Sequence, residues 1–352
     1  MPRILPPQRG EGRPHLGIVA SGLACVRAPA LCGGMTKRIA LLFAGQGAQA
    51  VGMGRDLAEQ YPAAAELFRE ADALLGRSLS GLAFSGPESE LVKTANCQPA
   101  LFVHGLACLA ALKTELATLG AEIGALPVHA AAGLSLGEFT AHAAAGTFSF
   151  ADGLRLVAER GRLMQDACEW TTGAMAAMIG GDETIVRQLA ADFDVDVANF
   201  NSPGQIVLSG EEAKIEAALE VARDRGIRKC AKLNVAGAYH SRLMQGAADA
   251  LVPKLATMPM QPPAFPVIAN VTARAVRDPA EIRAALSAQV TGSVRWTETI
   301  EFLVDSEKVE LFLELGPGGV LAGLVKRTRK DTPVLSITDS ASLAAALAVL
   351  RG

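Results

Sequence analysis

The sequence has few cysteines and histidines, the residues on which disulfide-rich and metal-stabilised domains depend. Six cysteines occur in 352 residues, and none of them forms a C-x-x-C pair. The five histidines show no H-x-x-x-H or comparable ligand spacing. These absences exclude a disulfide scaffold and give no sign of a structural metal. We expect the thiols to be reduced, as they are in the cytoplasm.

Charge of one sign and long apolar runs are also scarce. The 33 Lys and Arg against 36 Asp and Glu leave a net charge of −3, which argues against broad electrostatic capture of nucleic acid or an anionic membrane. The longest weakly charged stretches, residues 94–112 and 123–137, are interrupted by polar residues, proline or glycine. Neither offers the ~20 consecutive apolar residues that a bilayer crossing needs. We therefore expect neither a nucleic-acid nor a membrane partner.

Residues 1–34 differ in kind from the rest of the chain. They are rich in proline, glycine and arginine and show no sustained strand or helix periodicity. Arg13, the apolar stretch 16–26 and the small residues 28–30 are similar to a secretory signal, but Glu11 and internal glycines weaken that pattern. We predict a disordered or spuriously translated extension with Met35 as the functional start, and export is the alternative.

The remaining sequence alternates between short apolar runs and helical patterns. Half of the residues are hydrophobic and the mean hydropathy is +0.27, enough for a sizeable core in one large domain or two smaller ones. Continuous apolar runs predict buried parallel strands at residues 39–43, 128–132, 267–269, 309–313 and 333–337. Helical patterns lie between them, including residues 55–75 and 98–119. This alternation predicts an α/β domain with a parallel sheet.

The middle of the chain has a different order of elements. Strands predicted at residues 174–179, 195–199, 205–209 and 229–235 enclose helices at 182–191 and 211–225. The order β-α-β-β-α-β is typical of a ferredoxin-like module. We therefore predict an α/β domain made of residues 35–172 and 237–352, with a ferredoxin-like subdomain of residues 173–236 inserted into it.

Residues 133–137 (GLSLG) match the G-x-S-x-G pattern and lie between a predicted strand and a predicted helix. In that position the glycines permit a sharp turn that exposes the Ser135 hydroxyl, and the following helix favours negative charge at the same spot. The alternative is a tight strand-to-helix turn in which the hydroxyl caps the helix. A catalytic serine needs a base. His240 is the best candidate because it follows a strand in a glycine-containing loop, whereas the other histidines lie in the extension or in apolar elements.

Six ordered motifs suggest a family. They are residues 43–49 (FAGQGAQ), 133–139 (GLSLGEF), 160–165 (RGRLMQ), 199–204 (NFNSPG), 237–241 (GAYHS) and 314–318 (ELGPG). Together they resemble the malonyl-CoA:acyl-carrier-protein transacylases, acyltransferases of fatty-acid synthesis whose fold also serves polyketide synthases. The resemblance extends from about Thr36 to the C-terminus. It implies a hydrolase-like large domain with a parallel sheet and an inserted ferredoxin-like small subdomain, in agreement with the order of elements.

The resemblance also implies roles for single residues. Ser135 would attack the malonyl thioester and carry the malonyl group as an ester, with His240 as general base and acid. Gln289 would orient His240 through its backbone carbonyl. The backbone N–H groups of Gln46 and Leu136 would form the oxyanion hole.

Arg160 would bind the malonyl carboxylate through its planar guanidinium. Without the motif, a solvated arginine on a helix that also carries Arg155 and Arg162 would be the better interpretation. Two departures from the family pattern lie near the site: Leu134 stands where a histidine is frequent, and Tyr239 where phenylalanine is common in malonyl-specific members.

The function implied by the resemblance is transfer of malonyl from malonyl-CoA to an acyl-carrier protein, without a cofactor, by a monomeric cytoplasmic enzyme. Because such carriers are acidic, we expect a basic docking surface, with residues 326–330 and 223–229 as the candidate clusters. Two alternatives stay open: a serine thioesterase or esterase that shares the elbow, and a non-catalytic carrier-binding subunit that kept the fold.

Overall fold

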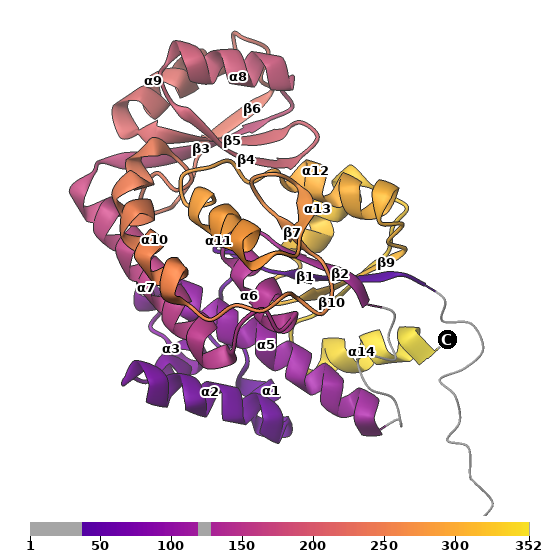
Figure 1. Cartoon of the computed structure of the whole chain (residues 1–352). Helices are drawn as coiled ribbons and strands as arrows, with labels where there is room; N and C mark the ends of the chain where they lie inside the picture. Colours follow the sequence, from indigo (N-terminus) through magenta and orange to yellow (C-terminus); the bar gives the residue numbers. More distant parts are fainter. Residues whose placement is uncertain (1–36, 119–127, 352) are drawn as a thin grey trace, which may run out of the picture.

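A computed structural model describes residues 37–118 and 128–351 of the chain (Figure 1). Two separate sheets organise this part, a large one of six strands and a small one of four. The extension predicted for residues 1–34 and the start predicted at Met35 lie outside the described residues.

The large sheet has the strand order β10-β9-β1-β2-β7-β8. Its strands are β1 (Ile39–Phe43), β2 (Val128–Gly133), β7 (Val267–Ala269), β8 (Arg274–Val276), β9 (Leu311–Leu315) and β10 (Val334–Ile337). The first five in that order run parallel, as predicted, and every residue of the central β1 and of β9 is buried. The edge strand β8 is antiparallel to β7 and was not predicted, because Arg274, Ala275 and Val276 form no continuous apolar run.

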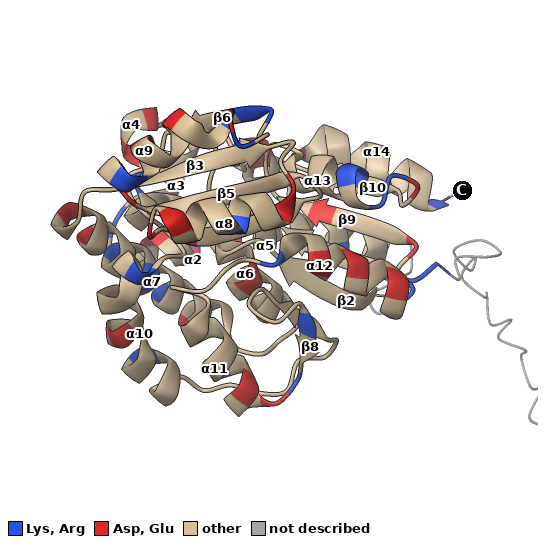
Figure 2. Cartoon of the chain, turned by 90° about the horizontal axis from the view of Figure 1, so that it is seen from above, with Lys and Arg blue, Asp and Glu red and all other residues tan. Residues whose placement is uncertain are grey.

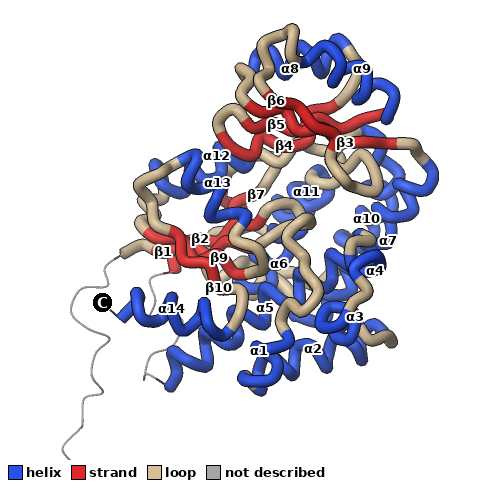
Figure 3. Tube along the Cα trace, turned by 180° about the vertical axis from the view of Figure 1, so that it is seen from behind, coloured by secondary structure: helices blue, strands red, loops and turns tan. Residues whose placement is uncertain are grey.

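Helices cover both faces of this sheet (Figure 3). They are α1 (Arg55–Gln60), α2 (Pro62–Leu75), α3 (Leu79–Ser85), α4 (Glu88–Leu91), α5 (Thr94–Thr118), α6 (Leu136–Ala144), α7 (Phe150–Trp170), α10 (Gln245–Thr257), α11 (Pro279–Ala288), α12 (Trp296–Glu301), α13 (Val320–Thr328) and α14 (Ser340–Arg351). A short 3₁₀ helix, η2 (Arg242–Met244), and a π-helical segment, η3 (Phe302–Ser306), accompany them. The helical pattern predicted for residues 55–75 is confirmed, but it forms two helices, α1 and α2, that break at Tyr61. Tyr61 is extended, with φ −120° and ψ 106°, because a residue before proline avoids the helical region.

Helix α5 is the central helix of the large domain. Among the described residues it is the one helix whose length and composition would suffice to cross a membrane, yet 72% of its most apolar window is buried inside the fold. Thr94, Gln98 and His104 are buried on it as well, and His104 Nε2 donates a hydrogen bond to the Thr338 carbonyl at 3.1 Å. Its apolar surface therefore packs in the protein core.

The small sheet has the order β4-β5-β3-β6, with all neighbours antiparallel. It consists of β3 (Gly173–Ile179), β4 (Asp196–Ser202), β5 (Gln205–Glu211) and β6 (Lys229–Lys232), and α8 (Glu183–Asp192) and α9 (Glu212–Ala222) lie on its outer face (Figure 1). This is the predicted ferredoxin-like arrangement. The last strand ends at Lys232 rather than at residue 235. The boundaries proposed after residues 172 and 236 stay predictions.

Strand β4 attaches the small sheet to the large domain. A single bridge joins Asn199 to Val294, the Phe200 N–H donates to the Val294 carbonyl, and the Val294 N–H donates to the Ala198 carbonyl. The guanidinium of Arg242, which belongs to η2, donates hydrogen bonds to Asp196 at the start of β4. These contacts hold the inner face of the small sheet over the carboxyl ends of β1 and β2, where the elbow lies.

The elbow depends on two glycines that contact backbone. A Cβ atom added to Gly137 would lie 2.1 Å from the Phe43 carbonyl oxygen, and one added to Gly133 would lie 1.9 Å from the Gly137 carbonyl carbon. Real Cβ atoms do not approach so closely, so strand β1, the elbow and α6 can pack together only if both positions lack a side chain.

We expect Gly137→Ala to lower the free energy of unfolding by about 1–3 kcal/mol, or to prevent folding, because the methyl group overpacks rigid backbone. Gly246→Ala is the matched control, since among the described residues no atom outside its own stretch of α10 lies within 4 Å of the added Cβ. That variant should be equally or slightly more stable, because alanine favours helix. Urea unfolding measures both, and equal stabilities would contradict the packing argument.

Candidate active site

Ser135 stands at the sharp turn between β2 and α6. Its backbone has φ 54° and ψ −108°, a combination that a residue with a side chain adopts only when its surroundings enforce it. Asn270, just beyond β7, provides that restraint: its Oδ1 accepts from the Ser135 N–H at 2.7 Å and its Nδ2 donates to the Gly133 carbonyl at 2.8 Å. The Ser135 hydroxyl does not cap α6, which argues against the helix-cap alternative.

His240 lies beside the serine although 105 residues separate them. Its Nε2 is 2.8 Å from Ser135 Oγ, while its Nδ1 is 2.9 Å from the Gln289 carbonyl oxygen and 3.2 Å from that of Gly292. A carbonyl can only accept, so Nδ1 carries the proton and Nε2 is left to accept the Ser135 hydroxyl proton. Burial, together with the nearby Arg160 charge, lowers the pKa of His240 to about 4. The imidazole is therefore a neutral base at ordinary pH.

Arg160 completes the group. It is 1% exposed, and its Nη2 donates to Ser135 Oγ at 3.1 Å and to Gln289 Oε1 at 2.9 Å, while Nη1 donates to Gln98 Oε1. All three acceptors are neutral, and no carboxylate of the described residues forms an ion pair with it. Burial lowers its pKa to about 10, so the guanidinium keeps its charge. An unpaired buried cation beside a nucleophile is suited to hold an anionic acyl group.

The neighbouring arginines of α7, Arg155 and Arg162, differ from Arg160 in exposure and in ion pairing. Arg162 forms ion pairs with Glu159 and Asp166 and is largely exposed, and Arg155 pairs with Asp152. The interpretation as a solvated arginine therefore fits these two residues and does not fit Arg160.

The Gln46 and Leu136 amides lie on either side of the elbow, Gln46 in the loop after β1 and Leu136 as the first residue of α6. Within the described ranges, neither N–H donates a hydrogen bond. Gly45 allows this approach, because a Cβ there would lie 2.3 Å from the Leu134 carbonyl oxygen. Two free donors next to Ser135 are what an oxyanion hole needs.

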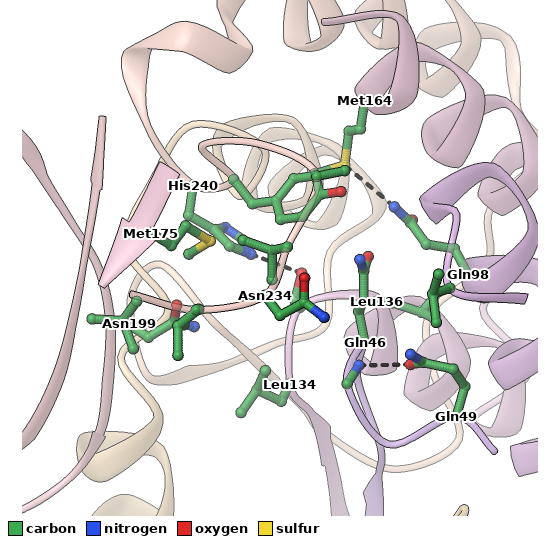
Figure 4. A pocket seen from close by; sticks show the side chains of 18 of the residues that line it. Gln46, Gln49, Gln98, Leu134, Leu136, Met164, Met175, Asn199, Asn234 and His240 are labelled. Carbon is green, nitrogen blue, oxygen red and sulfur yellow. Dashed lines mark hydrogen bonds between the residues drawn. The ribbon is translucent and has the colours of Figure 1, made fainter. Parts of the chain in front are cut away.

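These groups open into a cavity of about 630 Å³ between the two sheets (Figure 4). Met175 and Asn199 of the small sheet lie on one side of it, and Gln46, Gln98 and Leu136 of the large domain on the other. The cavity is thus formed jointly by the two parts of the chain. Asn199 lies in strand β4 and its side chain also lines this cavity.

The two departures near the site both line this cavity. Leu134 is partly buried and places an aliphatic side chain at the elbow. Tyr239 is 6% exposed, burial raises the pKa of its phenol, and its hydroxyl lies close to Gln46, Cys168 and Thr94. The phenol adds a buried polar group to the cavity wall that phenylalanine would not supply.

Three residues of the site were not predicted from the sequence: Gln98, Glu138 and Asn270. Glu138 lies inside the elbow motif, and Asn270 follows a strand of the large sheet, where side chains from neighbouring parallel strands converge. The position of Asn270 after a strand could therefore have predicted it as a site residue. Nothing in the sequence predicted Gln98, because it lies on an apolar helix whose neighbours are known only once α5 packs against α7. No group of three or more potential metal ligands occurs within residues 37–118 and 128–351.

Comparison with known proteins gives a consistent result. The model of the family described as acyl transferase domain matches residues 40–347. The malonyl CoA-acyl carrier protein transacylase of Bacillus subtilis is 40% identical over 319 residues, covering 89% of this chain and 98% of the relative. That of Escherichia coli strain K12 is 38% identical, covering 88% and 99%.

Solved structures agree. The acyl-carrier-protein S-malonyltransferase of Bartonella henselae has a TM-score of 0.84 and 41% identity, covering 89% of this chain and 99% of its own. A malonyl-transacylase in complex with its type II polyketide synthase acyl-carrier protein has a TM-score of 0.83 and 38% identity, covering 89% of this chain and 99% of its own. The chain therefore belongs to the acyl transferase domain family, among the malonyl-CoA:acyl-carrier-protein transacylases that its motifs resemble.

Proposed function

We propose that this chain moves the malonyl group from malonyl-CoA to the phosphopantetheine thiol of an acyl-carrier protein, through a malonyl ester on Ser135. One observation carries the proposal: the Ser135 hydroxyl is bonded at once to a neutral imidazole and to a buried, unpaired guanidinium. The first makes the oxygen nucleophilic. The second provides a place for the carboxylate that distinguishes malonyl from uncharged acyl groups.

In the first half-reaction, His240 Nε2 removes the hydroxyl proton as Ser135 Oγ attacks the thioester carbonyl. The negative charge that develops on the carbonyl oxygen is stabilised by the Gln46 and Leu136 amides. The carbon–sulfur bond then breaks, and His240 donates its proton to the leaving coenzyme A thiolate. Ser135 is left as a malonyl ester and His240 as a neutral base.

The second half-reaction repeats these steps with another nucleophile. His240 removes a proton from the carrier thiol, the sulfur attacks the ester, and the serine oxygen leaves with the proton returned by His240. In both half-reactions Gln289 accepts a hydrogen bond from His240 Nδ1 at its backbone carbonyl and one from Arg160 at its side-chain oxygen. A single residue therefore fixes the position of the base relative to that of the guanidinium.

Mixing the purified protein with malonyl-CoA is expected to yield a stable malonyl-enzyme, visible by intact-protein mass spectrometry and lost on addition of phosphopantetheinylated carrier. The matched control is a carrier without its phosphopantetheine arm, which should leave the malonyl-enzyme unchanged. Rapid release of free malonate without a carrier would instead indicate a thioesterase. Complete absence of acylation would favour the non-catalytic alternative.

Of the two basic clusters, residues 326–330 are the better candidate for carrier docking. They lie at the end of α13, whose residues Val320 and Leu324 line the cavity, and Figure 2 shows basic residues at that end. Within the cluster, Arg329 is already paired with Glu301 and Asp305. We propose docking there by a monomeric, cytoplasmic enzyme; the four described cysteines are free thiols, which suits a reducing compartment.

A further inference from the structure

A buried carboxyl group lies beneath the elbow. Glu138 belongs to the first turn of α6, three residues after Ser135, and is 0% exposed. Its Oε2 accepts from the Asn270 N–H at 3.0 Å and from Gln289 Nε2 at 2.6 Å. Its Oε1 has no hydrogen-bond partner among the described residues. The mechanism above assigns this acid no role.

Among the described residues, Glu138 forms no ion pair with the buried cation of the site, Arg160. The Gln289 side chain lies between them, donating from Nε2 to Glu138 and accepting at Oε1 from Arg160. The same Nε2 also donates to the Ser135 carbonyl at 2.9 Å. An amide thus separates the acid from the guanidinium, and a carboxylate buried without a contacting cation is costly to ionise.

We propose that Glu138 is a positioning residue that remains protonated when malonyl-CoA binds, so that Arg160 reserves its positive charge for the substrate carboxylate. This inference rests on the proposed function. With Glu138 and His240 neutral, the buried groups carry one positive charge, which the malonyl carboxylate neutralises. With Glu138 ionised, the same groups sum to zero, and binding malonyl would bury an uncompensated negative charge.

Glu138 is expected to lose its proton within a pH range in which the effect on malonyl binding can be measured. Burial raises the pKa of Glu138 to about 7, although hydrogen bonds from Gln289 and Asn270 and the Arg160 charge act in the opposite direction. The titratable groups around the network are Arg160 from α7 and His240 and Tyr239 from the loop before η2. None of these three titrates near 7, since their pKa values are about 10, about 4 and raised above that of an ordinary phenol.

The sign of the pH effect follows. As pH rises through about 7, Glu138 loses its proton, the attraction for a malonyl carboxylate falls, and kcat/KM for acylation by malonyl-CoA should drop on the order of tenfold, equivalent to one pKa unit of linkage. Acetyl-CoA carries no carboxylate, so its acylation should lack this decline. Glu138→Gln cannot ionise at this position and should remove the decline for malonyl-CoA.

Glu314→Gln is the matched control. Glu314 is also 0% exposed and its pKa is also raised by burial, but it accepts from the Leu321 and Ala322 amides and from Ser336, away from the elbow. This variant should keep the wild-type pH profile. The proposal is overturned if Glu138→Gln retains the decline, or if acetyl-CoA shows the same decline as malonyl-CoA in the wild type.

Infrared difference spectroscopy provides a readout independent of turnover. The carbonyl band of a protonated carboxyl group should be present in the wild type at about pH 6, weaken near pH 8, and be absent in Glu138→Gln. Loss of acylation with this band intact would refute the proposed function alone. Absence of the band in the wild type would refute the inference alone, and the wild-type spectrum decides even if the variant fails to fold.

Discussion

Ser135→Ala is expected to abolish the malonyl-enzyme and to reduce malonyl transfer on the order of 10⁶-fold. The Ser135 oxygen is the group bonded to His240 Nε2, and alanine leaves the base with no proton to take. Residual transfer would depend on direct attack by the carrier thiol on bound malonyl-CoA. Intact-protein mass spectrometry after incubation with malonyl-CoA and a radiolabel transfer assay measure the two quantities.

Ser149→Ala is the matched control for this experiment. Ser149 caps α7 through a hydrogen bond to the Asp152 N–H and does not line the cavity, so its loss should cost about 1 kcal/mol of stability and leave acylation intact. Malonyl incorporation that survives in Ser135→Ala would show that another residue is the nucleophile.

Arg160→Ala is expected to change acyl-group preference more than any other substitution. A hydrogen bond to a charged group contributes about 1.5–3 kcal/mol, so the ratio of kcat/KM for malonyl-CoA to that for acetyl-CoA should fall roughly 10- to 150-fold. The absolute rates will fall as well, since Arg160 also donates to Ser135 and Gln289. The ratio isolates the carboxylate contact because the lost internal bonds affect both substrates.

Arg162→Ala removes a neighbouring arginine that is ion-paired on the surface, and it should leave the ratio unchanged. Arg160→Lys tests geometry, because a lysine keeps the charge but cannot donate through two parallel N–H groups. An intermediate ratio is expected for it. If Arg160→Ala leaves the wild-type ratio unaltered, Arg160 does not bind the carboxylate.

Local patterns predicted the secondary structure well where one pattern dominates. Strand β1 begins and ends where its apolar run does, and the four strands of the small sheet follow the predicted order. A predicted boundary was wrong where a neighbour outside the pattern decides it. Strand β9 runs two residues later than expected because it pairs in register with β1. Within residues 55–75, Pro62 restricts Tyr61 to extended backbone and so divides the helical pattern into α1 and α2.

In the candidate site, too, only the residues that belong to a local sequence pattern could be predicted from the sequence. A glycine-flanked serine and a loop histidine can be recognised from the sequence. The six ordered motifs add Arg160, Gln46 and Leu136, and the family resemblance adds Gln289. Glu138 was read only as part of the elbow motif. Its raised pKa follows from complete burial, which outweighs the opposing hydrogen bond from Gln289, 151 residues away.

The sequence alone determined which chemical groups are available and where the backbone can turn sharply, since these depend on residue type and on neighbours within a few positions. Only the tertiary structure decided which groups meet and in which protonation state. Contact between Ser135, His240 and Arg160 requires closure of the large sheet and the helices around it, and the pKa of each buried group depends on how completely that packing removes water.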